Sequence, residues 1–265
     1  MLSILVATVL TLAVGLPALV WSFQERLLFF PQPLRSRPAA QTAEEVIVAS
    51  ADGKRLRGWF VKGSTHLVRA PLVIYFGGNA EEVSWLASMA ERFAGWSLLL
   101  LNYRGYGQSE GTPGETALFN DALLAYDYAT RRADVDRARI VVMGRSLGSG
   151  VAVHLAANRP LRGVILISPY DSMVALAKYH YPFLPVSLLL RHHFDSLSHA
   201  PLIDVPLLCL VAAEDRVVPG ERSRVLFEAW HGVKTLREIA RADHDSISDD
   251  TEYWRAIAQF LQSLG

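Results

Sequence analysis

Short apolar runs alternate with longer amphipathic stretches through most of the 265 residues of this chain. This alternation is typical of a mostly parallel sheet whose strands are joined by helices. Asp52 and Gly53, a dipeptide that favours hairpins, separate the first two runs and predict an antiparallel pair. The later six are apolar almost throughout, as expected of strands covered on both faces. The eight predicted strands are residues 46–50, 55–61, 72–76, 97–102, 139–143, 163–168, 206–212 and 235–240.

Five stretches carry apolar residues at the helical spacings of three and four. They are residues 81–93, 115–132, 147–158, 221–230 and 251–264. One further segment, residues 171–200, has no strand pattern and is apolar, aromatic and interrupted by prolines. We interpret it as a short helical lid inserted between strands six and seven. The candidate substrate-binding residues in and just before it are Tyr170, Tyr179, Tyr181, Phe183, Leu184 and Leu188.

The amino-terminal stretch from Leu2 to Phe23 contains no charged side chain and is long enough to cross a bilayer as a helix. Trp21 and Phe29 lie near its end, where aromatic rings favour the headgroup layer. We therefore predict a single-pass membrane anchor with its interfacial segment in residues 1–30, followed by one folded domain in residues 31–265. A buried helix of that domain and a cleaved signal peptide are the alternatives. The basic start and small-residue cleavage site of a signal peptide are not evident.

Composition argues against several classes of function. Lysine plus arginine and aspartate plus glutamate each number 26, so the zero net charge gives no indication of a nucleic acid partner. Cys209, the single cysteine, lies in an apolar run where a thiol packs as a small hydrophobe. No ligand set has structural-zinc spacing. Residues 243–245, Asp-His-Asp, are not interpreted as a metal site, because adjacent residues rarely direct their side chains at one ion. The loop from Tyr103 to Gly111 lacks the Gly-Lys-Ser/Thr ending of a phosphate loop, so no cofactor is predicted.

The segment from Gly144 to Gly148 reads Gly-Arg-Ser-Leu-Gly and connects the predicted strand at 139–143 to the predicted helix at 147–158. In this strand-turn-helix context, Gly-x-Ser-x-Gly predicts a nucleophile elbow, a sharp turn that exposes the serine hydroxyl. An ordinary helix N-cap would also use a serine, but it would not need glycine on both sides. Ser146 is therefore the predicted nucleophile.

A serine hydroxyl needs a base within hydrogen-bond reach and a third group that orients the base. In the expected chain order of serine, acid and histidine, Asp215 follows the seventh strand and His244 follows the eighth. Functional groups collect in such loops at the carboxyl ends of strands. Glu214 is the alternative acid and His231 the alternative base, although a surface or helix C-cap role suits His231 better.

An oxyanion hole needs two backbone N–H groups directed at the developing negative charge. Leu147, the residue after the nucleophile, supplies one in this type of elbow. The second is predicted in the loop after the third strand, where Asn79 is the chosen donor and Gly78 the alternative. A plain turn without this role is the other interpretation of that loop.

Together these residues resemble the α/β-hydrolase superfamily and, within it, the small membrane-anchored Bem46-like serine hydrolases. The resemblance spans nearly the whole chain. Residues 77–80, Gly-Gly-Asn-Ala, resemble the family's His-Gly-Asn-Ala oxyanion loop, and residues 102–111 resemble its glycine-rich loop after the fourth strand. Further resemblances are residues 24–31 after the anchor and residues 168–172 and 194–196 beside the lid. Two departures are Gly77, where the family has histidine, and Ala213, where glycine is common.

The resemblance implies an α/β-hydrolase fold with helices on both faces of the sheet, a lid and an N-terminal hydrophobic helix. It also implies a membrane-associated serine hydrolase that cleaves carboxylic esters or thioesters through an acyl-enzyme intermediate. The apolar lid and the predicted anchor favour acyl or lipid-like substrates, including acylated proteins, and membrane lipids as partners. A serine peptidase or amidase is the alternative enzyme on the same fold, and a non-catalytic scaffold protein is the alternative from another class.

Overall fold

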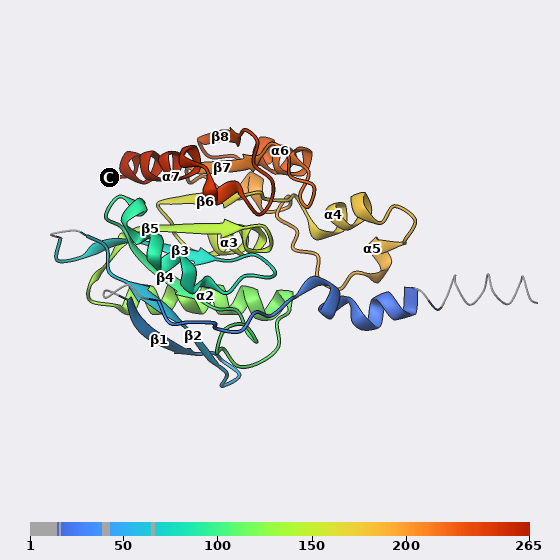
Figure 1. Cartoon of the computed structure of the whole chain (residues 1–265), viewed down its shortest axis with the longest axis horizontal. Helices are drawn as coiled ribbons and strands as arrows, with labels where there is room; N and C mark the ends of the chain where they lie inside the picture. The colour runs from blue at the N-terminus through green and yellow to red at the C-terminus, as the bar shows by residue number, and fades with distance from the viewer. Residues whose placement is uncertain (1–14, 16, 39–42, 65–66) are drawn as a thin grey trace, which may run out of the picture.

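One eight-stranded sheet organises the chain in the computed structural model, which describes residues 15, 17–38, 43–64 and 67–265 (Figure 1). The strand order is β1-β2-β4-β3-β5-β6-β7-β8. As predicted, β1 and β2 are antiparallel, and β2 is also antiparallel to β4, while all other pairs are parallel. The strands are β1 Ala43–Ala49, β2 Arg55–Val61, β3 Ala70–Phe76, β4 Ser97–Leu101, β5 Val135–Arg145, β6 Gly163–Ile167, β7 Leu207–Ala212 and β8 Lys234–Ile239.

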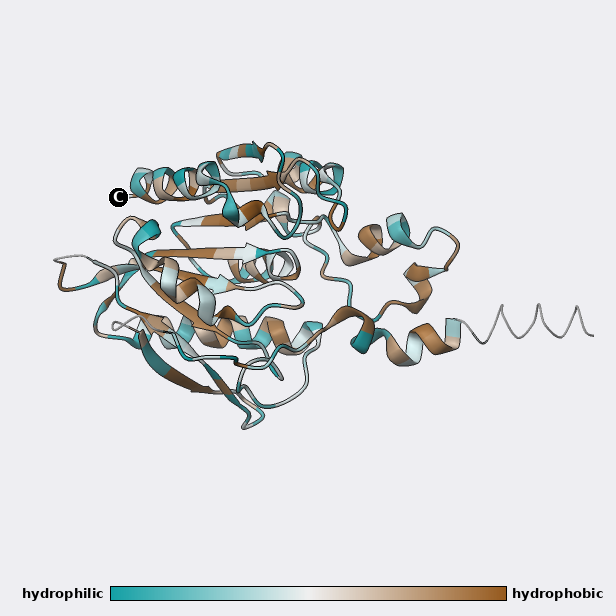
Figure 2. Cartoon of the chain, in the orientation of Figure 1, coloured by the Kyte–Doolittle hydropathy of each residue, from teal (hydrophilic) through white to brown (hydrophobic). Residues whose placement is uncertain are grey.

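Helices cover both faces of this sheet, because side chains of each central strand point alternately to opposite faces. In β7, Leu207, Cys209 and Val211 pack on one face, and the residues between them pack on the other. The first face is covered by α2 Glu115–Arg131, α3 Leu147–Asn158 and α6 Gly220–Ala229, and the second by η1 Val83–Phe93 and α7 Thr251–Ser263. The hydropathy colouring shows brown central strands and mixed helices, as expected of a buried parallel sheet (Figure 2).

The structure differs from the predicted elements mainly at their ends. The helix predicted at 81–93 is a 3-10 helix that begins at Val83, and the Glu82 carboxylate caps it by accepting a hydrogen bond from the Ser84 N–H. The strand predicted at 139–143 begins earlier, at Val135, because the chain pairs with Ala70 before a register shift between Ala70 and Leu72. Two short 3-10 helices, η2 Ala200–Leu202 and η3 Ile247–Asp249, were not predicted.

Between β6 and β7, two short α-helices precede η2: α4 Met173–His180 and α5 Val186–Leu189. Ser172 caps α4 by accepting a hydrogen bond from the Ala175 N–H. We call residues 171–200 the insertion. Its two helices project beyond the carboxyl ends of the strands (Figure 1). Ser146, which precedes α3, lies at the same end of the sheet.

Residues 17–28 form a helix that leads into the domain beside the insertion (Figure 1). Phe29 follows it and is buried against the rings of His192 and Phe194. Over the part of the chain that the structure describes, no helix has both the length and the hydropathy needed to cross a bilayer. Residues 1–14 and 16 of the predicted anchor lie outside the described residues.

Candidate active site

Ser146 lies in a strained turn between the end of β5 and the start of α3. Its backbone angles are φ 51° and ψ −118°, which a residue with a side chain rarely adopts. The two flanking glycines are required by close backbone approach. A Cβ on Gly144 would lie 2.2 Å from the carbonyl oxygen of Gly148, and a Cβ on Gly148 would lie 2.1 Å from that of Phe76. The spacing of small residues in the motif therefore follows from packing against β3 and α3.

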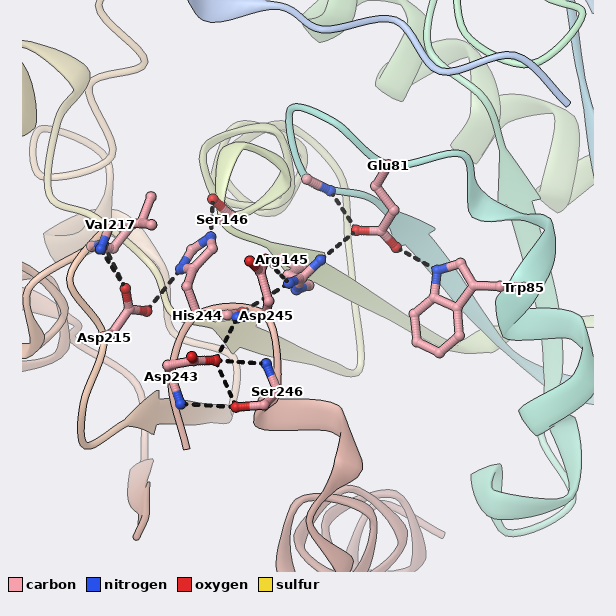
Figure 3. Close-up of polar contacts among 12 residues, drawn as sticks. Glu81, Trp85, Arg145, Ser146, Asp215, Val217, Asp243, His244, Asp245 and Ser246 are labelled. Carbon is pink, nitrogen blue, oxygen red and sulfur yellow. Dashed lines mark hydrogen bonds and ion pairs between the residues drawn. The ribbon is translucent and has the colours of Figure 1, made fainter. Parts of the chain in front are cut away.

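Ser146, His244 and Asp215 form a continuous series of hydrogen bonds (Figure 3). The Ser146 Oγ lies 3.0 Å from His244 Nε2, and His244 Nδ1 lies 2.8 Å from Asp215 Oδ2. Because an ionised carboxylate only accepts hydrogen bonds, Nδ1 carries the proton that is donated to Asp215. Nε2 is then free to accept the Ser146 proton, which is the arrangement that general-base catalysis needs.

The loop after β7 fixes the Asp215 carboxylate from its other side. Oδ1 accepts the backbone N–H groups of Val217 at 2.9 Å and Val218 at 2.7 Å. Burial favours the neutral acid and so raises the pKa, but the hydrogen bond and charge of His244 and the backbone N–H of Val218 outweigh it. The pKa of Asp215 therefore lies below its usual value, and the group is ionised at neutral pH.

The two alternative residues lie outside this series. The neighbouring acid, Glu214, is exposed to solvent. His231 is also exposed and pairs with Asp204 in the loops before β7 and β8. Of the candidate acids and bases, Asp215 and His244 are therefore the pair that forms a hydrogen-bonded series with Ser146.

The predicted oxyanion loop follows β3 and faces Ser146. The Gly78 N–H is already donated to the Glu81 Oε2 at 2.8 Å, so it does not point freely at a substrate oxygen. Within the described part of the chain, the Asn79 N–H has no hydrogen-bond acceptor, and the Leu147 N–H opens α3, where no intrahelical acceptor is available. Asn79 and Leu147 also both line the cavity above Ser146.

A buried Glu81 carboxylate holds the predicted oxyanion loop and is connected to His244 through Arg145 (Figure 3). Its Oε1 accepts hydrogen bonds from the Tyr75 hydroxyl at 2.7 Å and the Trp85 indole N–H at 2.8 Å. Its Oε2 lies 3.1 Å from Arg145 Nη1, and Arg145 Nη2 donates to the His244 carbonyl at 2.8 Å. This network therefore connects the oxyanion loop, the elbow and the histidine loop.

The network formed by Glu81 and Arg145 was not predicted from the sequence. The available signal was the charged residue at the second position of the elbow motif, because a cation between a buried strand and a buried helix needs an anionic partner. The family's histidine is absent at position 77, where a Cβ would lie 3.1 Å from Val83 Cγ1. In this chain the Glu81 side chain holds the loop by accepting the Gly78 N–H.

A cavity of about 560 Å³ opens above Ser146. Three of the six candidate residues predicted in and before the lid line it: Tyr170, Tyr181 and Leu184. The other three, Tyr179, Phe183 and Leu188, do not line it and are 58%, 97% and 84% exposed. Lining residues that were not predicted include Val20, Gln24, Leu27 and Leu28 before the sheet, and Met173, Leu176, Ala177, His180, Val186, Leu190, Arg216, Val217 and Val218 after β6.

Known proteins resemble this chain over most of its length. It is 37% identical to "Uncharacterized protein Rv2307c" of Mycobacterium tuberculosis over 263 residues, which cover 97% of this chain and 93% of the relative. It is 29% identical to the "Alpha/beta hydrolase domain-containing protein WAV2" of Arabidopsis thaliana, covering 92% and 89%. A family model described as serine aminopeptidase S33 matches residues 69–194. The chain belongs to the α/β-hydrolase superfamily.

Two further comparisons concern this α/β-hydrolase. A Pyrococcus furiosus esterase has the same fold, with a TM-score of 0.69 and 18% identity over 89% of this chain and 97% of the esterase. The Saccharomyces cerevisiae relative "Uncharacterized membrane protein YNL320W" is 26% identical, covering 94% of this chain and 92% of the relative.

Among the described residues of the α/β-hydrolase, no group of three or more histidine, cysteine or acidic side chains is arranged to hold a metal ion.

Proposed function

We propose that this α/β-hydrolase is a membrane-associated serine hydrolase that cleaves carboxylic ester or thioester bonds of acyl or lipid-like substrates. The observation that carries the proposal is the hydrogen-bonded series of Ser146, His244 and Asp215 at the base of an apolar cavity. The superfamily membership and the esterase fold of the Pyrococcus structure support the hydrolase class.

In the acylation half of the reaction, Ser146 Oγ attacks the carbonyl carbon while His244 Nε2 accepts its proton. The resulting oxyanion lies against the N–H groups of Asn79 and Leu147. As the tetrahedral intermediate collapses, the bond to the leaving oxygen or sulfur breaks, and His244 returns the proton to the leaving group. The products are an alcohol or thiol and an acyl ester on Ser146.

Deacylation repeats these steps with water. His244 accepts a proton from the water as its oxygen attacks the acyl carbon, and the same two N–H groups face the second oxyanion. Collapse breaks the bond to Ser146 Oγ, which takes back the proton held by His244. The carboxylic acid leaves, and the enzyme returns to its starting state without a cofactor.

A fluorophosphonate probe tests the nucleophile directly. The wild type should be labelled, and Ser146→Ala should not, because the probe bonds to an activated serine oxygen. Ser149→Ala is a matched control. Ser149 lies one turn along α3, and its hydroxyl donates to the Ser146 carbonyl at 2.6 Å without contacting His244. Equal labelling of wild type and Ser146→Ala would refute the assignment, and no labelling of wild type would favour a non-catalytic scaffold.

Several observations support a lipid setting for the substrate. Leu2 to Phe23 carries no charge, and the yeast relative is named a membrane protein. Exposed apolar side chains, including Trp21, Phe183 and Leu188, lie on the helix of residues 17–28 and on the insertion. Exposed apolar patches of this kind are used for membrane or protein contact. We therefore propose that the cavity opens beside the bilayer and receives acyl substrates from it.

Amide hydrolysis is the second candidate, because the matching family model is described as serine aminopeptidase S33. The same nucleophile and base attack amides, so the leaving group decides between the two activities. Paired p-nitrophenyl butyrate and aminoacyl p-nitroanilide assays distinguish them. We expect turnover of the ester. Faster turnover of the anilide would replace the esterase proposal with a peptidase.

A further inference from the structure

The helix of residues 17–28 presents one face to the cavity. Val20, Gln24, Leu27 and Leu28 line it, and their spacing of four, three and one residues places them on a single side of a helix. Across the cavity lie Leu176, Leu184 and Leu190 of the insertion. The space above Ser146 is therefore bounded by two apolar surfaces that lie far apart in the sequence.

Gln24 fixes this helix to the insertion. Its side chain is only 4% exposed. Its Nε2 donates to the Leu189 carbonyl at 3.1 Å, and its Oε1 accepts the Arg191 N–H at 2.7 Å. The buried amide uses both its nitrogen and its oxygen to pair with backbone groups of the insertion. Separating the helix from the insertion is therefore costly, because it would leave these polar groups unpaired. Arg191 adds a contact over the Trp21 ring at 4.9 Å.

The end of the same segment contacts the predicted oxyanion loop. The Phe30 N–H donates to the Asn79 carbonyl at 3.0 Å, and the Asn79 side-chain amide donates to the Leu28 carbonyl at 3.2 Å. The Tyr106 hydroxyl also donates to the Asn79 carbonyl, at 2.6 Å. Asn79 is thus held by the chain that follows the helix, so this chain contacts both the cavity and the loop beside Ser146.

We propose that residues 17–30 form part of the substrate site. The helix face that carries Val20, Gln24, Leu27 and Leu28 binds the linear acyl chain of the substrate. This inference rests on the proposed function and extends it. The segment predicted only as an anchor and interface then also determines which acyl chains are accepted. The acyl chain lies between this face and the leucines of the insertion, and its carbonyl carbon lies at Ser146.

Leu27 and Leu19 provide a matched test of this proposal. Both are leucines of the same helix with similar exposure, 59% and 56%, but only Leu27 lines the cavity. Full-length Leu27→Ser and Leu19→Ser remove the same apolar surface from the helix. The measurement is kcat/KM for p-nitrophenyl acetate and p-nitrophenyl octanoate, with Leu27→Met as the conservative variant.

We expect Leu27→Ser to lower kcat/KM for octanoate about tenfold and to change the acetate value less than about twofold, since each buried methylene is worth about a factor of four. Leu19→Ser should match wild type with both esters, and Leu27→Met should retain octanoate turnover. An unchanged octanoate to acetate ratio in Leu27→Ser, or an equal change in Leu19→Ser, would overturn the inference while leaving the esterase intact. Absence of turnover by wild type with both esters would instead refute the proposed function and the inference with it.

Discussion

The two sides of the cavity are built in opposite ways. Below Ser146, polar side chains are buried and each is held by several hydrogen bonds, as at Asp215 and Glu81. Above it, the helix of residues 17–28 and the insertion are largely apolar and half-exposed, and Gln24 supplies their main polar connection. The lower side lies at strand ends of a buried sheet, whereas the upper side projects from it (Figure 1).

In the proposed function, this difference separates chemistry from selectivity. Proton transfer and oxyanion binding need atoms held within a fraction of an ångström, which a hydrogen-bonded network on rigid strands provides. Recognition of an acyl chain needs apolar area with little directional demand, because the hydrophobic effect is non-directional. Changes on the lower side should therefore affect every substrate, and changes on the upper side should affect acyl length or membrane contact.

The largest effect is expected for Asp215→Asn on the lower side. The asparagine can donate to His244 and so favours the wrong tautomer, which should lower kcat by roughly 10⁴-fold. Steady-state hydrolysis of p-nitrophenyl acetate measures it. Glu214→Gln, at the neighbouring exposed acid, should stay near wild type, and the reverse order of the two effects would assign the acid to Glu214.

Glu81→Gln should have the next largest effect. The amide removes the negative charge paired with Arg145 and cannot accept at both former oxygens, so the oxyanion loop and the histidine loop lose their connection. We expect kcat to fall about 10- to 100-fold with little change in KM, the signature of lost transition-state stabilisation. Glu91→Gln, on an exposed position of η1, is the control. An effect on KM alone would show that Glu81 acts on substrate binding instead.

Contact of the insertion with lipid can be measured at Phe183. Burial raises the pKa of the Cys209 thiol to about 12, so an environment-sensitive thiol dye should react with Phe183→Cys and spare Cys209 in the folded protein. Dye emission should rise several-fold on addition of lipid vesicles, because position 183 is 97% exposed beside the cavity. Val233→Cys, exposed before β8 at the opposite end of the sheet, should not respond. Equal responses at both positions would contradict a membrane-facing insertion.

The smallest effect concerns stability, at a histidine on α3, the helix that begins at Leu147. His154 is stacked on Phe119 with ring centroids 3.9 Å apart, and burial, with a smaller effect of His199, lowers its pKa from 6.5 to about 4. Between these values the unfolded chain binds the proton more readily, so the free energy of unfolding should fall as pH decreases. The contribution to the slope is below about 1.4 kcal/mol per pH unit. Urea unfolding across this range should show a shallower slope for His154→Gln, and an identical slope would exclude this histidine as the source.

The sequence by itself determined the features that depend on local pattern. Apolar runs located the eight strands, and this signal was strongest in β3, β4, β6 and β7, which are buried throughout. The helix after the elbow was predicted at residues 147–158 and is observed as Leu147–Asn158. Ser146, Asp215 and His244 were selected from their places after the fifth, seventh and eighth strands, and the structure brings them within hydrogen-bond distance.

Only the tertiary structure decided which distant segments meet. Arg145 and Glu81 are 64 residues apart, and Gln24 and Leu189 are 165 residues apart, so no local periodicity relates them. The turn between α4 and α5 then decided that Leu184 faces the cavity while Phe183 faces solvent. The apolar pattern can be recognised in the sequence because burial acts on each residue separately. A hydrogen bond between two loops depends instead on how the whole sheet positions those loops.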